Sequence, residues 1–407
     1  MRFGTQLLSF VQDDQGVTAT LLTDGSEEVH EVRASYLVAA DGAGSGIRQA
    51  LGIEMADRGG SLEGPLGQYV NIYFHANLGR LVEGRQFGLC FVENPESPGI
   101  ILAVNNTDRW LFNVPYAPEQ GATLADFGPE RCAELIRAAI GLPELAVEIL
   151  SVLPWEAAAR IADRFQSGRV LLIGDAAHTM PSAGAFGPNT AVQDAQNVCW
   201  KLATVLGGVA EPSLLATYEV ERRPLAERVV DMAMREMDAP SPDAPVGEDA
   251  EEGADPTAAE TMPGQLPPVL GHQYADGALA ADDPAAGTDD KPGTQAQHVW
   301  LERTGQRLST IDLFGDHLVL LAGAAGTSWC DAARTVADRR GLPLGAHRIG
   351  TGSDLADPDA SWCRAYGVSQ DGAVLVRPDG AVDWRRASAV VEPEIEIARA
   401  LGALVGA

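Results

Sequence analysis

The stretch RVLLIGDAAHTMPSAGAFGPNTAVQDA, residues 169–195, decides the fold. An apolar strand runs into an acidic residue, then into a loop rich in Gly and Pro, and then into an amphipathic run. This order is typical of a nucleotide-binding turn, where a strand ends at a ligand and a helix begins beside it. Asp175 at the strand end can accept hydrogen bonds from sugar hydroxyls. Gly184 and Gly187 would let the backbone approach a ligand closely.

The helix that follows this loop also fits a ligand. We expect Asn189 or Thr190 to cap it, with its positive dipole end and its unbonded N–H groups facing an electron-rich atom. The alternative is a tight strand–helix connection that holds no ligand and merely ends in a capping Asn. The loop by itself supports both interpretations equally.

Composition limits the classes of function. The chain has 407 residues, 45% of them hydrophobic, which is long enough for two or three domains. A formal net charge of -28 argues against nucleic acid or an anionic membrane as partner. Five cysteines without CxxC spacing predict neither a disulfide framework nor a metal site and favour a reducing cytoplasm. We find neither a signal-peptide pattern nor an apolar run long enough to span a bilayer.

The remaining patterns predict a mixed α/β chain. Residues 1–40 read as a β meander whose third strand ends at Asp41 and enters a Gly-rich turn and a short helix. Residues 67–116 read as further strands, followed by a helix and one more strand before the opening motif. A helix with one buried stripe is expected over 191–206. A second helix, over 213–237, is rich in Glu and Arg, and we interpret its segment 219–228 as a solvated face.

Two segments resemble a known family. Residues 174–203 resemble the second FAD-contacting motif of flavin-dependent aromatic hydroxylases of the p-hydroxybenzoate hydroxylase type, and YLVAADGAGSGIR (36–48) resembles the family's DG motif. They occur in the family's order, with a predicted sheet between them. The pattern from residue 298 onward is similar to the thioredoxin-like domain of the branch that acts on phenols and aromatic polyketides. The resemblance covers nearly the whole chain.

The resemblance implies the fold and its domains. We expect an α/β (α+β mixed) chain: a doubly wound FAD-binding domain, N-terminally incomplete, with an inserted β-sheet substrate domain and a C-terminal thioredoxin-like domain. The expected ranges are 1–62 for the partial FAD-binding domain, 63–154 for the substrate domain, 155–237 for the rest of the FAD-binding domain, 238–297 for an acidic, Pro-rich linker, and 298–407 for the thioredoxin-like domain.

The resemblance also implies the chemistry. Such enzymes reduce FAD with NAD(P)H, form a flavin hydroperoxide with O2, and transfer oxygen to a phenolic or polyketide-derived ring. Asp175 would bond the ribityl chain, amides around Asn189 and Thr190 would stabilise the reduced flavin, and Asp41 and Arg48 would lie near the pyrophosphate. The full set implied for the cofactor is Asp41, Arg48, Gly174, Asp175, Pro181, Gly184, Gly187, Asn189 and Thr190. No catalytic side chain is singled out, and a homodimer is left open.

Two departures from the family pattern matter. Ala185 stands where the family commonly has Gly, which adds a methyl group near the expected flavin ring. No GxGxxG turn, the family's seat for the ADP half of FAD, precedes Asp41. We therefore expect this chain alone to bind FAD poorly, with the turn supplied by a longer reading frame or by another chain. The alternatives are a flavin-free remnant or partner subunit and, less favoured, a related halogenase or epoxidase.

Smaller signals complete the expectations. His178 is interpreted as a structural hydrogen-bonding residue rather than a catalytic one. Substrate contacts are proposed on the predicted strands, where alternate residues share a face; the residues chosen are Tyr69, Tyr73, Trp110 and Asn113. Cys330 and Cys363 stand alone in the C-terminal domain, so thiol exchange is not expected there and a packing or assembly role is favoured.

Overall fold

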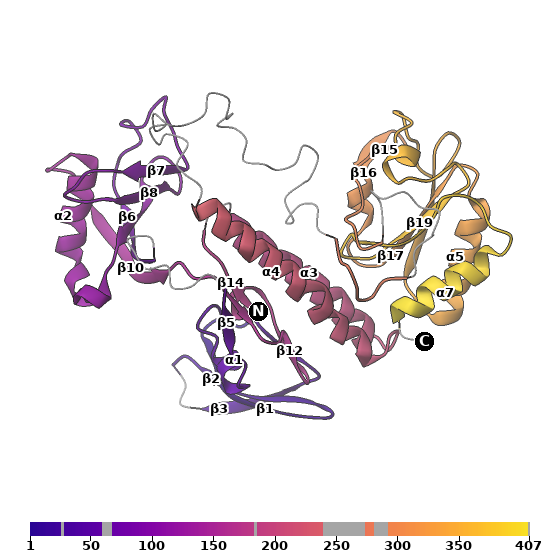
Figure 1. Ribbon diagram of the computed structural model, residues 1–407, viewed down its shortest axis with the longest axis horizontal. Helices are drawn as coiled ribbons and strands as arrows, with labels where there is room; N and C mark the ends of the chain where they lie inside the picture. Colours follow the sequence, from indigo (N-terminus) through magenta and orange to yellow (C-terminus); the bar gives the residue numbers. More distant parts are fainter. Residues whose placement is uncertain (26–27, 59–66, 183–184, 239–272, 281–291, 406–407) are drawn as a thin grey trace, which may run out of the picture. The chain divides into compact units, whose positions relative to one another are not determined.

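The computed structural model describes residues 1–25, 28–58, 67–182, 185–238, 273–280 and 292–405, and Figure 1 shows its ribbon. These residues form two compact units. The first comprises Met1–Ala56, Arg160–Thr179 and Ala183–Ala407, and the second comprises Asp57–Ala159 and Met180–Ser182. Both flavin-type motifs and the C-terminal α/β pattern therefore belong to one unit.

The first unit opens with the expected meander. Strands β1 (Thr5–Asp13), β2 (Gly16–Thr23) and β3 (Val29–Ala34) form an antiparallel sheet in chain order. The stretch expected to form the third strand is divided: β3 ends at Ala34, and β4 (Leu37–Ala39), which leads into helix α1 (Gly46–Ala50), belongs to another sheet. The three-stranded meander is confirmed, but the prediction that its third strand continues to Asp41 is wrong.

The two motif strands are neighbours. Strand β13 (Val170–Leu172) is fully buried and pairs in parallel with β4, while β12 (Gln166–Ser167) pairs with β13 from the other side. A second small sheet has the order β14-β11-β5, made of β5 (Met55–Asp57), β11 (Arg160–Ala162) and β14 (His178–Thr179). Between β13 and β14 lies the one-turn helix η3 (Gly174–Ala176). The parallel pair brings the carboxyl ends of β4 and β13 to one edge.

Two long helices follow. Helix α3 (Phe186–Leu206) begins five residues before the expected 191, and η5 (Pro212–Leu215) leads into α4 (Ala216–Asp238). Figure 1 shows α3 and α4 side by side. Both helices bury charged side chains among apolar ones: Asp194 and Lys201 on α3 and Arg222 on α4.

The second unit is a five-stranded antiparallel sheet with one helix. Its order is β10-β6-β9-β8-β7, with β6 (Gln68–His75), β7 (Leu89–Val92), β8 (Gly99–Ala103), β9 (Arg109–Pro115) and β10 (Glu148–Glu156). After β9 come η1 (Pro118–Gln120), η2 (Leu124–Phe127) and α2 (Pro129–Ile140). One face of the sheet forms a core with α2, built from Val70, Ile72, Phe74, Trp110, Phe112, Val114, Cys132, Leu135 and Ile136. By strand alternation, the opposite face carries Asn71, Tyr73 and Asn113.

The C-terminal part has a thioredoxin-like topology. A hairpin of β15 (Trp300–Arg303) and β16 (Gln306–Ser309) and the turn η6 (Thr310–Leu313) precede the order β17 (Leu318–Gly323), α5 (Thr327–Arg340), β18 (Leu344–Ile349), α6 (Trp362–Ala365), β19 (Ala373–Val376), β20 (Val382–Arg386), α7 (Pro393–Val405). The sheet order is β18-β17-β19-β20, parallel only between β17 and β18. Burial raises the pKa of Cys330 to about 11, which keeps it a thiol and agrees with the absence of a CxxC pair.

Part of the expected linker is packed instead. Within the range 238–297, Tyr274, Ala278 and Ala296 are at most 4% exposed, and Gln273 pairs with Thr294 in an antiparallel bridge. The glycine at 277 has φ of +121°, and a Cβ there would lie 2.4 Å from Cγ of Glu221. The Pro- and Gly-rich composition suggested a solvated connection, but for residues 273–280 it reflects close packing on α4.

A buried cluster of charges joins α3 and α4 to the C-terminal sheet. We call it the Glu221 cluster; its members are Asn197, Lys201, Glu221, Tyr274, Arg377 and Asp379. The Glu221 carboxylate accepts hydrogen bonds from Lys201 Nζ at 2.8 Å and from both terminal nitrogens of Arg377 at 2.9 Å. Although burial favours the neutral acid, Arg377 and Lys201 hold the pKa of Glu221 far below its usual value. The prediction of a solvated face over 219–228 is therefore wrong at Glu221.

Asp383, on β20, predicts a measurable pH effect. Burial raises its pKa to about 7, against the attraction of Arg377 and with Glu221 and Asp379 adding repulsion. The folded state therefore holds a proton that the unfolded chain has already lost, so this group destabilises the fold increasingly as the pH rises from about 4 to about 7. Relative to Asp383→Asn, the parent should lose on the order of 4 kcal/mol of unfolding free energy across that window.

Urea unfolding at a series of pH values measures this difference. Asp359→Asn, a change at an exposed carboxylate without a hydrogen-bond partner among the described residues, is the control and should track the parent. If the difference in unfolding free energy between the parent and Asp383→Asn were the same at every pH, Asp383 would ionise as freely in the folded protein as in the unfolded chain.

Candidate functional site

The DG segment (residues 36–48) and the second flavin-type segment (residues 174–203, called the GD segment after Gly174 and Asp175) open onto the same edge of a sheet. Strands β4 and β13 run parallel, and the amide of Ile173 donates to the carbonyl of Ala39 at 3.0 Å. Arg48 ties the following turns together: its guanidinium is buried and donates to the carbonyls of Ala176 at 3.1 Å and Ala43 at 2.9 Å. In parallel sheets the ligand edge lies at the carboxyl ends of the strands, so both motifs open onto the same edge.

Asp175 stands exposed on this edge. It follows Gly174, whose φ of +57° places it in the left-handed region, and a Cβ at Gly174 would lie 3.0 Å from Cβ of Ala191. Glycine is therefore required by both backbone and space. The Asp175 carboxylate has no hydrogen bond or ion pair with any described residue. It is thus available to accept hydrogen bonds from a ligand's hydroxyl groups.

Asp41 and Arg48 stabilise the DG turn through hydrogen bonds. Asp41 accepts hydrogen bonds from Ser45 Oγ at 2.5 Å and from the amide of Ile47 at 3.1 Å, which fixes the start of α1. Both terminal nitrogens of Arg48 are occupied by carbonyls. We therefore keep these two as part of the site, but as residues that shape its edge. Their direct contact with a pyrophosphate stays a prediction.

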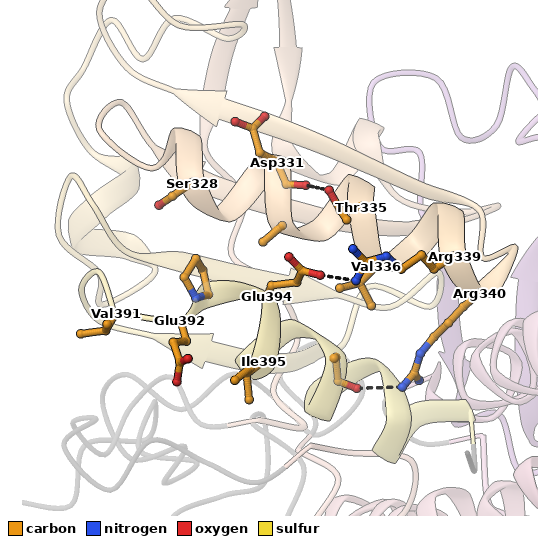
Figure 2. Close-up of a pocket in the computed structure, with 13 residues that line it drawn as sticks. Ser328, Asp331, Thr335, Val336, Arg339, Arg340, Val391, Glu392, Glu394 and Ile395 are labelled. Carbon is orange, nitrogen blue, oxygen red and sulfur yellow. Dashed lines mark hydrogen bonds and ion pairs between the residues drawn. The ribbon is translucent and has the colours of Figure 1, made fainter.

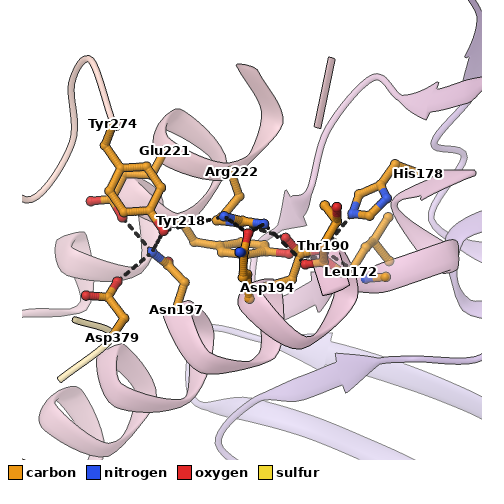
Figure 3. A network of polar contacts seen from close by, with 12 residues as sticks. Leu172, His178, Thr190, Asp194, Asn197, Tyr218, Glu221, Arg222, Tyr274 and Asp379 are labelled. Atoms are coloured by element: carbon orange, nitrogen blue, oxygen red, sulfur yellow. Dashed lines mark hydrogen bonds and ion pairs between the residues drawn. The ribbon is translucent and has the colours of Figure 1, made fainter. Parts of the chain in front are cut away.

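A buried network lies beneath the GD turn, and Figure 3 shows it. We call it the Asp194 network; its members are Gly174, His178, Thr190, Asp194 and Arg222. Asp194 accepts hydrogen bonds from the Gly174 amide at 3.1 Å and Arg222 Nε at 2.7 Å, and its Oδ2 lies 2.6 Å from His178 Nε2. Burial opposes ionisation of Asp194, but His178 and Arg222 lower its pKa. The carboxylate thus clamps the turn that presents Asp175.

The helix start differs from the expectation. Asn189 and Thr190 lie inside α3, where their side chains bond the carbonyls of Ala185 at 3.0 Å and Phe186 at 2.8 Å. The cap position is Ala185, with φ of 54° and no capping side chain. The amides without a helical partner are consequently those of Ala185, Phe186 and Gly187, since Pro188 has none. The predicted cap at Asn189 or Thr190 is wrong.

Ala185 has a left-handed backbone conformation at the position where the family commonly has glycine. A left-handed backbone costs an L-residue roughly 1–2 kcal/mol, so the residue is strained where the family sequence is not. Gly187 is the second residue of α3, Pro181 is buried in a segment grouped with the second unit, and Gly184 lies outside the described residues.

The proposed substrate residues divide between two faces of the second unit's sheet. Trp110 is fully buried in the core, and its Nε1 donates to the carbonyl of Ala76 at 3.0 Å. The prediction that Trp110 contacts the substrate is therefore wrong. Tyr69, Tyr73 and Asn113 lie on the opposite face, although Tyr69 is largely covered by the ring of Trp155, 5.2 Å away between centroids.

One residue on that face was missed. Asn71 on β6 lies directly opposite Asn113 on β9. In both, Oδ1 is buried and has no hydrogen-bond partner within the part of the chain that the structure describes. Such groups are rare in folded proteins and call for a partner. The strand alternation would have identified Asn71 if the covered face had been known.

Two cavities are formed wholly or partly by the C-terminal domain. A groove of about 780 Å³ runs between α5 and α7 of the C-terminal domain, as Figure 2 shows, with Asp331, Arg339 and Glu394 along it. Another, of about 460 Å³, is lined mainly by apolar residues of α3 and the C-terminal domain, including Trp200. Neither includes Asp41 or Asp175. Within the described ranges no His, Cys, Asp and Glu cluster could hold a metal, and no helix is long and apolar enough to cross a membrane.

The donor and acceptor set at the edge suits half of a flavin cofactor. An exposed carboxylate suits the hydroxyls of a ribityl chain, and unbonded amides at the start of a 21-residue helix suit the electron-rich end of an isoalloxazine ring. The residues that are present therefore fit FAD.

The chain's relatives agree with this fit. The FAD binding domain family matches residues 1–233, and the family described as aromatic-ring hydroxylase, C-terminal, matches residues 289–407. The chain belongs to the FAD-dependent aromatic-ring hydroxylases. It is 40% identical to aklavinone 12-hydroxylase of Streptomyces purpurascens, over 96% of this hydroxylase and 72% of the relative. It is also 40% identical to tetracenomycin A2 monooxygenase-dioxygenase of Streptomyces glaucescens, over 94% and 68% respectively.

Solved structures give the same assignment. The hydroxylase superimposes on aklavinone-11 hydroxylase, solved as a ternary complex with FAD and aklavinone, with a TM-score of 0.83 and 38% identity. The match covers 100% of this chain and 74% of that one. The flavin-dependent monooxygenase PieE, solved with FAD and substrate, matches with a TM-score of 0.82 and 31% identity over 100% and 76%. The expectations of an FAD-dependent aromatic monooxygenase with a thioredoxin-like tail are thereby confirmed.

Proposed function

We propose that this hydroxylase acts on a polycyclic, oxygen-bearing aromatic of the polyketide type, and that Asn71 and Asn113 bind the oxygens of that substrate. When bound, FAD takes a hydride from NAD(P)H and makes O2 competent to hydroxylate an electron-rich ring. The relatives named above act on aklavinone and on a tetracenomycin, which supports this substrate class. The observation that carries the proposal is a pair of buried amide oxygens, Oδ1 of Asn71 and of Asn113, which lie on one sheet face and have no partner among the described residues.

The chain's own residues contribute binding and orientation. Asp175 accepts hydrogen bonds from the ribityl chain, and the first amides of α3 favour negative charge on the reduced ring. Arg48 holds the DG and GD turns in register through its two carbonyl contacts. None of these residues needs to exchange a proton with the substrate, in keeping with a cofactor that carries the reactive chemistry.

The sheet face supplies specificity. Ile100 and Leu102 on β8, Leu111 on β9 and Leu153 on β10 share this face with the two asparagines by strand pairing. An apolar floor binds a flat ring system, while polar groups at fixed positions select where its oxygens lie. A pair of carboxamides can donate to quinone carbonyls and accept from phenols.

The variant Asn113→Leu tests the substrate assignment. Because Oδ1 of Asn113 is buried without a partner, its loss should leave the unfolding free energy unchanged or raise it by about 1 kcal/mol. Affinity for a hydroxyanthraquinone should fall about tenfold, since one hydrogen bond to the ligand is lost. Fluorescence titration of the ligand and urea unfolding measure the two quantities.

A tricyclic hydrocarbon without oxygens is the matched control ligand. It should bind parent and Asn113→Leu equally, because it makes no use of the amide. Equal loss for both ligands would indicate a change of shape rather than a lost hydrogen bond. Undiminished affinity for the hydroxyanthraquinone would rule out Asn113 as its partner.

The reaction consumes NAD(P)H, and the five cysteines are all free thiols. Both facts support a cytoplasmic location as part of this proposal.

A further inference from the structure

Two buried charged residues of the C-terminal domain contact elements outside that domain. Arg377 and Asp379 lie in the turn between β19 and β20, and both are at most 5% exposed. Arg377 bonds Asp379 through Nε at 3.0 Å and through a terminal nitrogen at 2.5 Å, and its other side-chain hydrogen bonds go to Glu221 on α4 and to the carbonyl of Ala278 at 2.9 Å. The C-terminal domain, which lacks a CxxC redox pair, thus forms a buried ion pair with helix α4 of the flavin-binding part.

We infer that the C-terminal domain positions the flavin turn: the Glu221 cluster and the Asp194 network form one buried polar chain from Asp379 to the amide of Gly174. This inference goes beyond the proposed function, which assigns the C-terminal domain no role. It rests on the proposed function only in taking the Gly174–Asp175 turn as the ribityl site.

The first link of the chain is the saturated carboxylate of Glu221. Besides Arg377 and Lys201, it accepts hydrogen bonds from Asn197 Nδ2 at 2.7 Å and from the amide of Ala278 at 2.8 Å. Every donor is buried, so solvent neither screens nor replaces these contacts. Displacing Glu221 therefore leaves several groups without partners at once.

The second link joins the two clusters at Tyr274, as Figure 3 shows. The Asn197 amide donates to Asp379 at 3.1 Å and to the Tyr274 hydroxyl at 3.4 Å. The same hydroxyl accepts from Arg222 at 3.5 Å. Glu221 and Arg222 are consecutive on α4, and each belongs to one of the two clusters. The same turn of α4 thus contacts the C-terminal domain through Glu221 and, through Arg222 and Asp194, the turn at Gly174.

The third link ends at the site. Arg222 Nε holds Asp194 at 2.7 Å, and Asp194 accepts from the Gly174 amide at 3.1 Å. Arg222 also donates to the carbonyl of Thr190 at 3.2 Å, which secures the first turns of α3. A shift of α4 at Glu221 would consequently move the partner of Gly174. Coupling through such a chain is an energy that can be measured.

Amide hydrogen exchange of the full chain without flavin tests the coupling directly. Arg377→Lys keeps the charge but loses the two-nitrogen contact with Glu221. We expect exchange at Gly174 to rise about fivefold or more, within the range typical of coupled sites, while amides of β2 stay unchanged. Arg386→Lys is the matched control, because Arg386 pairs with Glu396 at 2.5 Å in the same domain but outside the chain of contacts.

A second pair of variants leaves every charged side chain in place. In Gly277→Ala the new methyl group presses on Glu221, whereas Gly305→Ala places alanine at a similar positive φ with no atom within 4 Å. Only the first should accelerate exchange at Gly174. In both variant pairs, equal exchange at Gly174 in test and control, or a uniform rise over all amides of the unit, would overturn the inference.

The affinity for riboflavin, measured by fluorescence quenching, is the second readout. It should fall in Arg377→Lys and Gly277→Ala but not in their controls. If the parent did not bind flavin, this would contradict the proposed function. The coupling would then be tested by the amide exchange at Gly174 alone.

Discussion

Asp175→Ala is expected to weaken binding of riboflavin, FMN and FAD by the same factor, about 10- to 100-fold. Asp175 is the exposed carboxylate of η3, the turn that follows β13, and it has no partner among the described residues. A hydrogen bond to a charged group contributes about 1.5–3 kcal/mol, which corresponds to that range. The ribityl chain is common to all three ligands, whereas the ADP half is not. An equal factor would therefore locate the contact on the ribityl side.

Quenching of flavin fluorescence on titration with protein measures the three affinities. Asp163→Ala, at another exposed aspartate without a side-chain partner in the described ranges, is the matched control and should bind like the parent. Asp175→Ala with the control's affinities would contradict the site. A loss confined to FAD would place Asp175 at the ADP half instead.

Arg222→Met should produce the largest loss of stability. Arg222 is fully buried and pairs with Asp194, and its removal leaves that carboxylate with His178 as its charge partner. Breaking a buried ion pair from one side costs about 3–5 kcal/mol. Methionine retains much of the apolar stem, so the loss reports the missing guanidinium.

The pH dependence identifies the cause of this loss. In the parent, the lowered pKa of Asp194 contributes stability that is present above the ordinary carboxyl pKa and disappears as the pH falls. Without Arg222, burial favours the protonated acid, so the gap between parent and variant should narrow from pH 7 to pH 4. Urea unfolding at both pH values gives the gap.

Arg223→Met is the control for position and size. Arg223 is the neighbouring residue on α4, with a half-exposed pair to Glu227 at 3.5 Å, and its loss should cost less than about 1 kcal/mol. A gap between parent and Arg222→Met that is the same at both pH values would attribute the loss to packing rather than to Asp194.

The motif pair was predictable because both halves are local patterns. The strand ending at Asp41, the strand ending at Asp175 and the glycine between strand and turn are each readable over about a dozen residues, and parallel pairing follows from the fold class. The start of α3 was not predictable to the residue. Ala185 occupies a left-handed cap position that the preferences of alanine do not indicate.

The buried charges could not be inferred from local sequence. A helix segment rich in Glu and Arg is ordinarily solvated, and Glu221 is buried only because Arg377 meets it from 156 positions away. Likewise, Gly277 belongs to a Pro- and Gly-rich stretch, but Glu221 is what requires glycine there. Such pairings depend on tertiary contacts between elements, which composition and periodicity do not contain.

The strand residues illustrate an intermediate case. Tyr69, Tyr73 and Asn113 were chosen from one face of β6 and β9, but Trp110 lies three positions before Asn113 on the same strand and so belongs to the other face by alternation alone. Asn71, which shares the face of Asn113, was overlooked. Which face α2 covers depends on a tertiary contact that the alternation does not contain.

Oxygen incorporation tests the central claim most directly. The protein is supplied with FAD, NADPH and a hydroxyanthraquinone and is incubated under isotope-labelled O2. The mass of the product is then measured by mass spectrometry. The account predicts a ring hydroxyl that carries one labelled oxygen atom, formed only when NADPH is present and strongly reduced in Asp175→Ala. A hydroxylated product without the label, whose oxygen therefore came from water, or NADPH oxidation without any hydroxylated product in the presence of bound flavin and substrate, would contradict it.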